Sequence, residues 1–146
     1  MPTVDAAADN LLSDLIRVAE QRKIAVSFQA ISGGTFGVSK RGTIDVDDRH
    51  ATGQQAKTLT HELAHEALHW KDCGPITCSI AELEAESVAY VVCTHFDLDV
   101  EVRASRYIAL WDGDSKALRA SLERIANTAR DIIDDVASLG GRRAVA

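Results

Sequence analysis

The sequence predicts an α+β fold, in which a small antiparallel sheet and an active-site helix are followed by further helices. One helix-length amphipathic segment comes first, three short strand-like segments follow it, and the remainder of the chain consists of long helical segments. Strands grouped together and followed by grouped helices are typical of α+β proteins, whereas α/β proteins alternate the two. At 146 residues the chain can build one hydrophobic core, so we expect a single domain over 1–146.

The first third of the chain supplies one helix and the sheet. Residues 5–22 carry apolar side chains at helical spacing. Residues 24–31 alternate in polarity as a half-buried strand does, and two shorter strands, 35–40 and 43–47, each follow a turn that contains glycine. Because strands joined by short turns usually pair side by side, we expect an antiparallel meander.

The helix predicted over 52–70 is the segment around which the chain is organised. Thr52 and Gln55 have the spacing of a capping box, and good helix formers follow them. Gly74-Pro75 lies just beyond the predicted end and would stop the helix.

Within this helix, His61, Glu62 and His65 form the pattern H-E-x-x-H. Residues four apart lie on one helix face, about 6 Å apart along the axis, so both imidazoles can converge on one Zn²⁺. Glu62 would lie beside them and take a proton from a metal-bound water. The same three letters also arise by chance, but the helical context favours a metal site.

A third ligand is expected from the helix predicted over 79–96. Ser79 and Glu82 match a second capping box, and Glu82 and Glu86 repeat the four-residue spacing of the two histidines. We predict Glu82 as the third ligand, and Glu84, on another side of the helix, as a solvated charge. Acidic residues in a first turn also simply complement the helix dipole.

Other candidates for the third ligand are weaker. His69 continues the row of histidines, but it lies about 12 Å from His61 along the helix axis, which excludes it as a ligand of the same ion. We expect His69 to rim the cleft, where it could contact substrate or an oxyanion, or to be exposed. If Glu82 does not bind the metal, Glu86 and His95 are next in line.

The two motifs together resemble those of zincin-like metallopeptidases of the ImmA/IrrE group, most closely their ArdC-type, or polyvalent-protein, relatives. The similarity rests on Thr-Leu-Thr-His-Glu-Leu-Ala-His at 58–65 and Glu-Leu-Glu-Ala-Glu-Ser-Val-Ala-Tyr at 82–90. It implies a gluzincin-type zinc peptidase with Glu82 as third ligand and Glu86 as the carboxylate that orients a ligand imidazole. The DNA-binding domain of full-length ArdC proteins has no counterpart here, so DNA binding is not implied.

Composition narrows the class of partner and the compartment. A net charge of −6 disfavours nucleic acid as the main partner. No apolar run approaches the ~20 residues of a membrane span, and we see no signal-peptide pattern at the N-terminus. The chain has three cysteines, Cys73, Cys78 and Cys93, and an odd number without a secretion signal indicates reduced thiols in a cytoplasmic protein.

The C-terminal part of the chain is expected to be mainly scaffold. Tyr107 lies on a short helix predicted over 104–111; it could donate to an oxyanion, although such a tyrosine more often packs in the core. Residues 115–139 form a long amphipathic helix that Gly140 should end, so we expect a flexible tail over 140–146.

Two functions are consistent with these motifs. The first is a zinc-dependent endopeptidase that cleaves a protein substrate, such as a repressor or host factor, and holds it by main-chain pairing with an exposed strand, for which 43–46 is the candidate. The second is a zinc-stabilised antirestriction or regulatory module that binds a partner without cutting it. Glu62 favours the enzyme, because a structural site needs no general base and would close its fourth position, here with Cys73 or Cys78.

Overall fold

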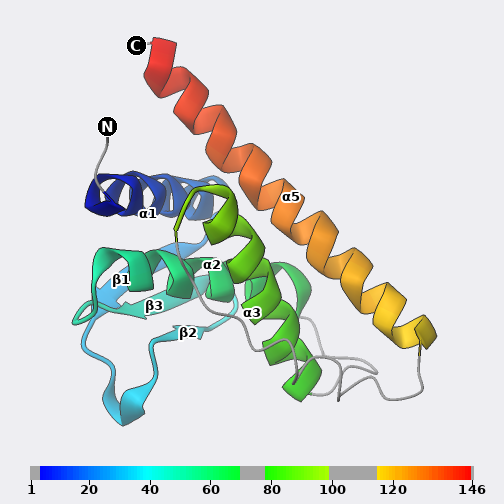
Figure 1. Ribbon diagram of the computed structural model, residues 1–146. Helices are drawn as coiled ribbons and strands as arrows, with labels where there is room; N and C mark the ends of the chain where they lie inside the picture. Colours follow the sequence, from blue (N-terminus) through cyan, green and yellow to red (C-terminus); the bar gives the residue numbers. More distant parts are fainter. Residues whose placement is uncertain (1–3, 70–77, 99–114, 146) are drawn as a thin grey trace.

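The computed structural model describes residues 4–69, 78–98 and 115–145, and its arrangement of elements is shown in Figure 1. It confirms the α+β class and the predicted order of the described elements, whereas 104–111 and Tyr107 lie outside the described residues. In chain order the elements are helix α1 (Val4–Gln21), strand β1 (Ala25–Gln29), 3-10 helix η1 (Ser32–Gly34), strands β2 (Gly37–Ser39) and β3 (Thr43–Asp47), and helices α2 (Thr52–Leu68), α3 (Cys78–His95) and α5 (Ser115–Val145).

The sheet is mixed, with the strand order β1-β3-β2, so the predicted antiparallel meander is wrong. Strand β1 pairs with β3 in parallel, from Ala25 opposite Thr43 onward, and only β2 pairs with β3 antiparallel. The segment after β1 is too long for a tight hairpin; it passes through η1 and delivers β2 to the far side of β3. Strand β3 is therefore central, which excludes 43–46 as an exposed edge, and β2 is the edge strand beside α2.

The pleat of β3 separates an apolar face from a polar one. Ile44 and Val46 are fully buried in the core beside apolar residues of α1 and α2. The alternate residues, Asp45 and Asp47, point to the other face, as period-two geometry requires. There Lys40 pairs with Asp45 at 2.6 Å, and Arg49 donates to Asp47 and lowers the pKa of that carboxyl.

Helix α2 lies at the centre of the molecule and packs against α1, α3 and the sheet. It begins at Thr52 as predicted, but the capping box is wrong, because the N-cap is Ala51 and makes no side-chain hydrogen bond. Gln55 instead donates to the backbone carbonyl of His50 at 2.8 Å. Buried residues such as Leu59 and Leu63 hold this helix in place through tertiary packing.

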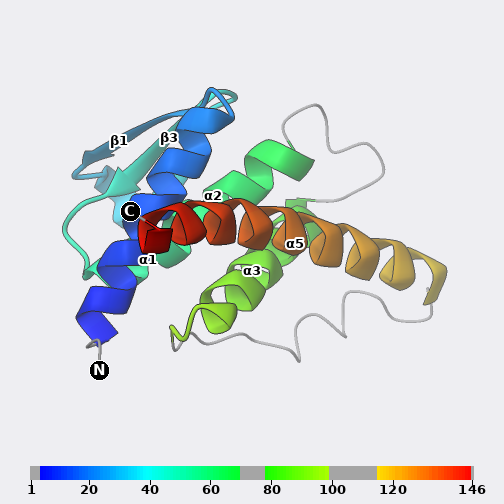
Figure 2. The ribbon, with the colours of Figure 1, turned by 90° about the horizontal axis from the view of Figure 1, so that it is seen from above.

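Helix α5 is a 31-residue helix that crosses α3 and α1, as Figure 2 shows from above. Its buried stripe includes Ile125, Ile132 and Val136. The helix continues through Gly140 to Val145, so the end predicted at Gly140 is wrong. Glycine permits a left-handed terminator without requiring one, and within a helix it costs only about 1 kcal/mol. Among the described residues, no helix has the length and apolarity needed to cross a membrane.

Candidate metal centre

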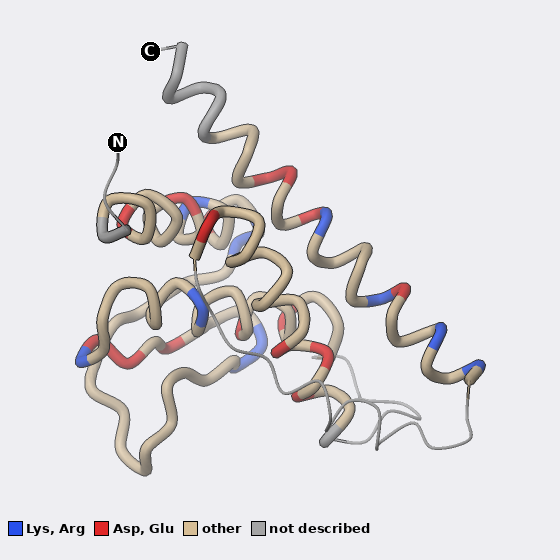
Figure 3. The backbone as a smooth tube through the Cα atoms, viewed as in Figure 1, with Lys and Arg blue, Asp and Glu red and all other residues tan. Residues whose placement is uncertain are grey.

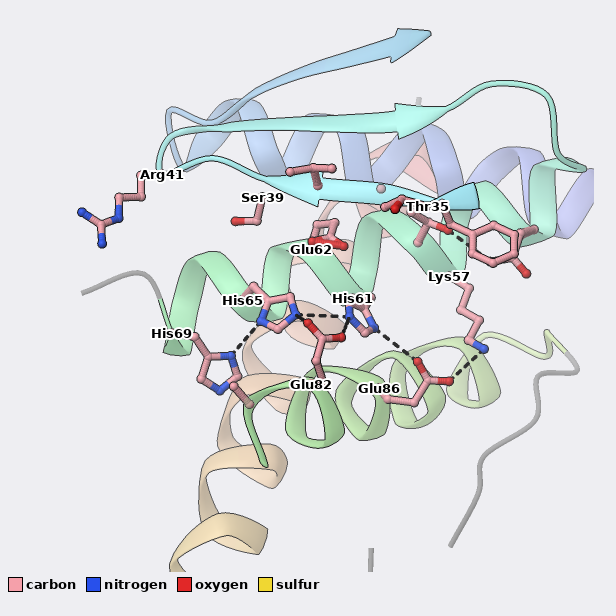
Figure 4. Close-up of a pocket in the computed structure, with 16 residues that line it drawn as sticks. Thr35, Ser39, Arg41, Lys57, His61, Glu62, His65, His69, Glu82 and Glu86 are labelled. Atoms are coloured by element: carbon pink, nitrogen blue, oxygen red, sulfur yellow. Dashed lines mark hydrogen bonds and ion pairs between the residues drawn. The ribbon is translucent and has the colours of Figure 1, made fainter. Parts of the chain in front are cut away.

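Three side chains converge between α2 and α3. His61 and His65, one helical turn apart on α2, point their Nε2 atoms toward each other at 3.2 Å. Glu82, in the early part of α3, places one carboxylate oxygen 3.1 Å from His61 Nε2 and the other 2.9 Å from His65 Nε2. Figure 4 shows the two imidazoles and this carboxylate facing one another. The structure therefore brings together the three residues that the sequence singled out as ligands.

The spacing of these atoms fits a small divalent cation. Two atoms that each lie 2.0–2.1 Å from a tetrahedral zinc ion are about 3.3–3.4 Å apart. The observed separations of 2.9–3.2 Å are close to that value, so an ion would need only small movements of Glu82. That movement is available, because the Glu82 side chain is 65% exposed. Two imidazoles and one carboxylate form a donor set that zinc accepts.

The ring nitrogen of His61 that faces away from His65 and Glu82, called here the outer nitrogen, has a carboxylate partner. His61 Nδ1 lies 3.2 Å from Glu86 Oε2, and Lys57 Nζ lies 2.9 Å from the other Glu86 oxygen. The hydrogen bond with His61 lowers the pKa of Glu86 to about 2, with help from Lys57. Burial alone would lower the pKa of His61, but its hydrogen bonds with Glu82 and Glu86 raise it to about 9.

This partner decides which atoms of His61 can accept a proton or a metal. Glu86 is ionised and can only accept, so Nδ1 of His61 must carry a hydrogen and donate it. In the neutral ring Nε2 then carries a lone pair and is an acceptor. It faces the carboxylate of Glu82, which is also an acceptor. Such an arrangement of acceptors needs a cation between them, which can be a proton or a metal ion.

The outer nitrogen of His65 leads into a longer, buried chain of contacts. His65 Nδ1 lies 2.9 Å from His69 Nδ1, and His69 Nε2 lies 2.9 Å from Glu84 Oε1. Glu84 Oε2 accepts hydrogen bonds from Ser121 and Arg124 of α5. Burial alone would raise the pKa of Glu84, but these three partners lower it to about 2.

Two predictions about this chain of contacts are corrected. The Glu84 side chain is 0% exposed, so it is not a solvated charge. His69 is buried, so the alternative that it is exposed is wrong; it does line the cleft, as expected, and its two nitrogens contact His65 and Glu84. The sequence pattern missed both, because the partners that bury Glu84 come from α5, 37 and 40 residues further along the chain.

Beside the three side chains lies a cleft of about 890 Å³, lined by β2, α2 and the start of α3. Glu62 lines it and is buried. In Figure 4 it lies on the β2 side of the histidines, whereas Glu82 lies on the α3 side. Burial raises the pKa of Glu62 above its ordinary value, although the charges of His61 and His65 oppose the rise. A carboxylate with a raised pKa is suited to taking up and returning a proton.

Strand β2 is fastened closely against α2. A side chain at Gly37 would place its Cβ 2.5 Å from Thr58 Cγ2 and 3.3 Å from Glu62 Cγ, so only glycine fits there without a shift. Glu66 secures the other end of the strand by accepting hydrogen bonds from the Ser39 hydroxyl and from the backbone amide of Gly42. Sequence reasoning missed Glu66, whose partners lie 24–27 residues away.

Other candidate residues lie elsewhere or are not described. His95 is exposed at the last turn of α3, with its ring against Phe96, and does not belong to the described metal-ligand cluster. Cys93 is a buried free thiol whose pKa burial raises to about 11, which makes it unreactive. Tyr107 and Cys73 lie outside the described residues, and the side chain of Cys78 is not described either.

Comparison with known proteins adds little to this geometry. No protein-family model matches the chain, and no solved structure matches it. The chain is similar to an uncharacterized protein of Bacillus anthracis, with 29% identity over 97 residues. The match covers 64% of this chain and 16% of that relative, so the chain spans about one sixth of the relative's length. The resemblance to ImmA/IrrE metallopeptidases stays a prediction that rests on the motif residues.

Proposed function

We propose that this protein is a zinc-dependent endopeptidase that acts on a protein or peptide substrate. The observation that carries the proposal is the convergence of two imidazole nitrogens and a carboxylate beside a buried glutamate, within one cleft. Zinc fits the donor set, and an open cleft next to it is what a catalytic site requires and a structural one does not. The resemblance to gluzincin-type peptidases supports the same assignment.

In this mechanism His61, His65 and Glu82 would hold the zinc ion. When bound, zinc polarises the scissile carbonyl and brings the pKa of its water to about 7. Glu62 would accept a proton from the attacking water and return it to the leaving amine, and its pKa, which burial raises, suits this exchange. Glu86 keeps the hydrogen on the outer nitrogen of His61, so that the inner nitrogen stays free to bind the metal.

The substrate is expected to lie along β2. Strand β2 lies at one end of the strand order and pairs with β3, so it is an edge strand, and Gly37 to Ser39 line the cleft opposite His61 and His65. An extended peptide can add to such an edge through main-chain hydrogen bonds. Phe36, 47% exposed at the cleft, offers an apolar surface for one substrate side chain. This strand replaces 43–46 in the role that the sequence analysis gave it.

The charge distribution supports a protein partner in preference to a nucleic acid. The chain carries a net charge of −6. Basic and acidic positions are mixed along α5, as Figure 3 shows, whereas nucleic-acid-binding surfaces gather basic residues on one face. The free buried thiol of Cys93 is consistent with a cytoplasmic location, which forms part of the proposal.

The proposal is tested by incubating the zinc-loaded protein with a library of unstructured peptides and identifying the cleavage products. We expect cleavage that a zinc chelator abolishes and that Glu62→Gln slows by roughly 10²–10⁴-fold, the contribution typical of a general base. Glu20→Gln, the same change at an exposed position of α1, is the matched control and should cleave at the normal rate.

Two other results would count against the peptidase. Cleavage by Glu62→Gln at the control rate would remove Glu62 from the mechanism. Zinc binding without cleavage of any library peptide would favour the alternative, a zinc-stabilised antirestriction or regulatory module that binds its partner intact.

A further inference from the structure

The chain of contacts behind His65 connects a candidate zinc ligand to a different helix. Its four linked side chains are buried or partly buried: the exposed fraction is 15% at His65, 4% at His69, 0% at Glu84 and 32% at Arg124. Ser121, also buried, closes the chain at 2.6 Å from Glu84 Oε2. Charged and polar groups are rarely buried unless they are fully paired, and here each one has a partner.

The direction of each hydrogen bond follows from the two ends of the chain. Glu84 receives hydrogens from Ser121 and Arg124 and is an acceptor throughout, so His69 must present a hydrogen on Nε2. In the neutral His69 ring, Nδ1 then carries a lone pair and accepts a hydrogen bond. His65 must therefore donate from Nδ1, and its Nε2 is the atom with a free lone pair.

We propose that His69 and Glu84 are positioning residues that set the tautomer and the orientation of His65, and that α5 takes part in this through Ser121 and Arg124. The inference rests on the proposed zinc site and names a support for it, through His69 and Glu84, to which the two motifs assign no role. A ligating histidine whose outer nitrogen is held by a hydrogen-bond acceptor is fixed in the tautomer and angle that the metal needs. Here the acceptor is a neutral imidazole, which in turn is fixed by a buried carboxylate.

The arrangement makes the docking of α5 a condition for a well-formed site. Glu84 sits two residues after Glu82 on α3, so the same helix supplies a ligand on one side and the support of His65 on another. Arg124 and Ser121 neutralise and fix Glu84 only when α5 lies against α3. Without α5, a buried carboxylate would lose two of its three partners.

The first experiment compares zinc affinities by competition with a chromogenic chelator. His69→Leu should weaken binding by roughly 10–100-fold, the range seen when the outer partner of a metal ligand is removed. His69→Gln keeps an acceptor toward His65 and a donor toward Glu84, so it should recover most of that loss. Arg124→Met should weaken binding, whereas Arg119→Met, exposed on the same helix, is the matched control and should bind like the unchanged protein.

A second measurement separates positioning from a general loss of structure. In zinc-loaded protein, ¹⁵N chemical shifts should identify His69 as a neutral ring with its hydrogen on Nε2, and His65 as a ring with its hydrogen on Nδ1. The visible absorption bands of the cobalt-substituted protein should shift in His69→Leu and return in His69→Gln. Glu84→Gln as a single variant should weaken zinc binding. Combined with His69→Leu it should cause no further loss of affinity, because Glu84 acts through His69.

Each outcome decides a distinct point. Failure of the unchanged protein to bind zinc would overturn the proposed function and this inference together. Normal zinc binding by the unchanged protein, with equal affinity and an unaltered cobalt spectrum in His69→Leu, would overturn this inference alone. A His69 hydrogen found on Nδ1 in the zinc-loaded protein would also overturn it.

Discussion

The two histidines of the candidate metal centre are supported from behind in contrasting ways. His61 is backed by Glu86 and Lys57, whose side chains are 33% and 21% exposed and come from α3 and α2. His65 is backed by His69 and Glu84, which are 4% and 0% exposed and are held by residues of α5. We call the first the outer support and the second the inner support.

The difference in burial predicts a difference in energy. A partly exposed ion pair contributes little to folding, because water and salt screen it. A buried carboxylate that loses its partners is costly, since the remaining charges stay uncompensated in a medium of low dielectric constant. The outer support should therefore affect metal binding by His61 with little effect on the stability of the fold. The inner support should affect both metal binding by His65 and the stability of the whole domain.

The largest effect is expected at Glu82, which lies against both of the supported histidines. This carboxylate contacts both His61 and His65. Removing a hydrogen-bond partner of a metal ligand weakens binding by up to roughly 100-fold. Glu82→Ala should weaken zinc binding by more than this, because it removes a ligand itself. Zinc content after gel filtration, measured by atomic absorption, provides the test. Full zinc occupancy in this variant would move the third ligand to another residue.

The next effect concerns the inner support and is an effect on stability. Glu84→Ala leaves Arg124 and His69 without their buried partner, so it should lower the free energy of unfolding by about 3–5 kcal/mol. Urea unfolding of the metal-free protein measures this quantity without interference from zinc. Glu123→Ala, at an exposed position of α5, serves as the comparison and should unfold like the unchanged protein. A loss below about 1 kcal/mol at Glu84 would make the two supports equivalent.

Glu86→Ala should behave in the opposite way. It removes the acceptor on His61 Nδ1, so zinc binding should weaken by roughly 10–100-fold. The free energy of unfolding of the metal-free protein should fall by no more than about 1 kcal/mol, because the pair with Lys57 is partly exposed. The same chelator competition and urea titration measure both quantities. If Glu86→Ala unfolds as easily as Glu84→Ala, the contrast between the supports is wrong.

The sequence predicted Glu86 of the outer support, through the family resemblance, but neither Lys57 nor the inner support, for a physical reason. His61, His65, Glu82 and Glu86 are paired by the four-residue spacing within each helix, and that spacing is visible in one dimension. Glu84 lies between them in sequence on another side of α3, where the pattern suggested solvent. Its burial is decided by the packing of α5, which no local pattern encodes.

The sheet illustrates the same limit. The positions of β1, β2 and β3 follow from polarity alternation and turns and were predicted closely, although β1 and β2 are shorter than expected. Their order depends on where the segment between β1 and β2 crosses, which is a property of the complete fold. The candidate edge strand therefore changed from 43–46 to Gly37–Ser39. The close contact between the backbone at Gly37 and the side chains of α2 could have been suspected only because residue 37 is a glycine.

A further predicted effect is a pH dependence centred on His61 and its two carboxylate partners, Glu82 and Glu86. In the metal-free protein the pKa of His61 is raised from 6.5 to about 9 by Glu82 and Glu86, after an opposing effect of burial. The stability that this shift contributes is complete below pH 6.5 and is lost as the pH rises toward 9. Zinc needs the neutral ring, so zinc affinity should rise over the same window, by at most about tenfold per pH unit. Thermal unfolding without zinc and calorimetry with zinc test the two opposite trends; parallel trends would contradict the assignment.

X-ray absorption at the zinc edge is the direct test of the claim that zinc is held by two imidazoles and a carboxylate with its fourth position open. Zinc-loaded protein should contain about one zinc per chain, with nitrogen and oxygen neighbours at about 2.0–2.2 Å and the multiple-scattering pattern of two imidazoles. Glu62→Gln should give the same spectrum, because Glu62 is expected to contact water and not the ion. A sulfur neighbour at about 2.3 Å, from Cys73 or Cys78, would close the fourth position and contradict the claim.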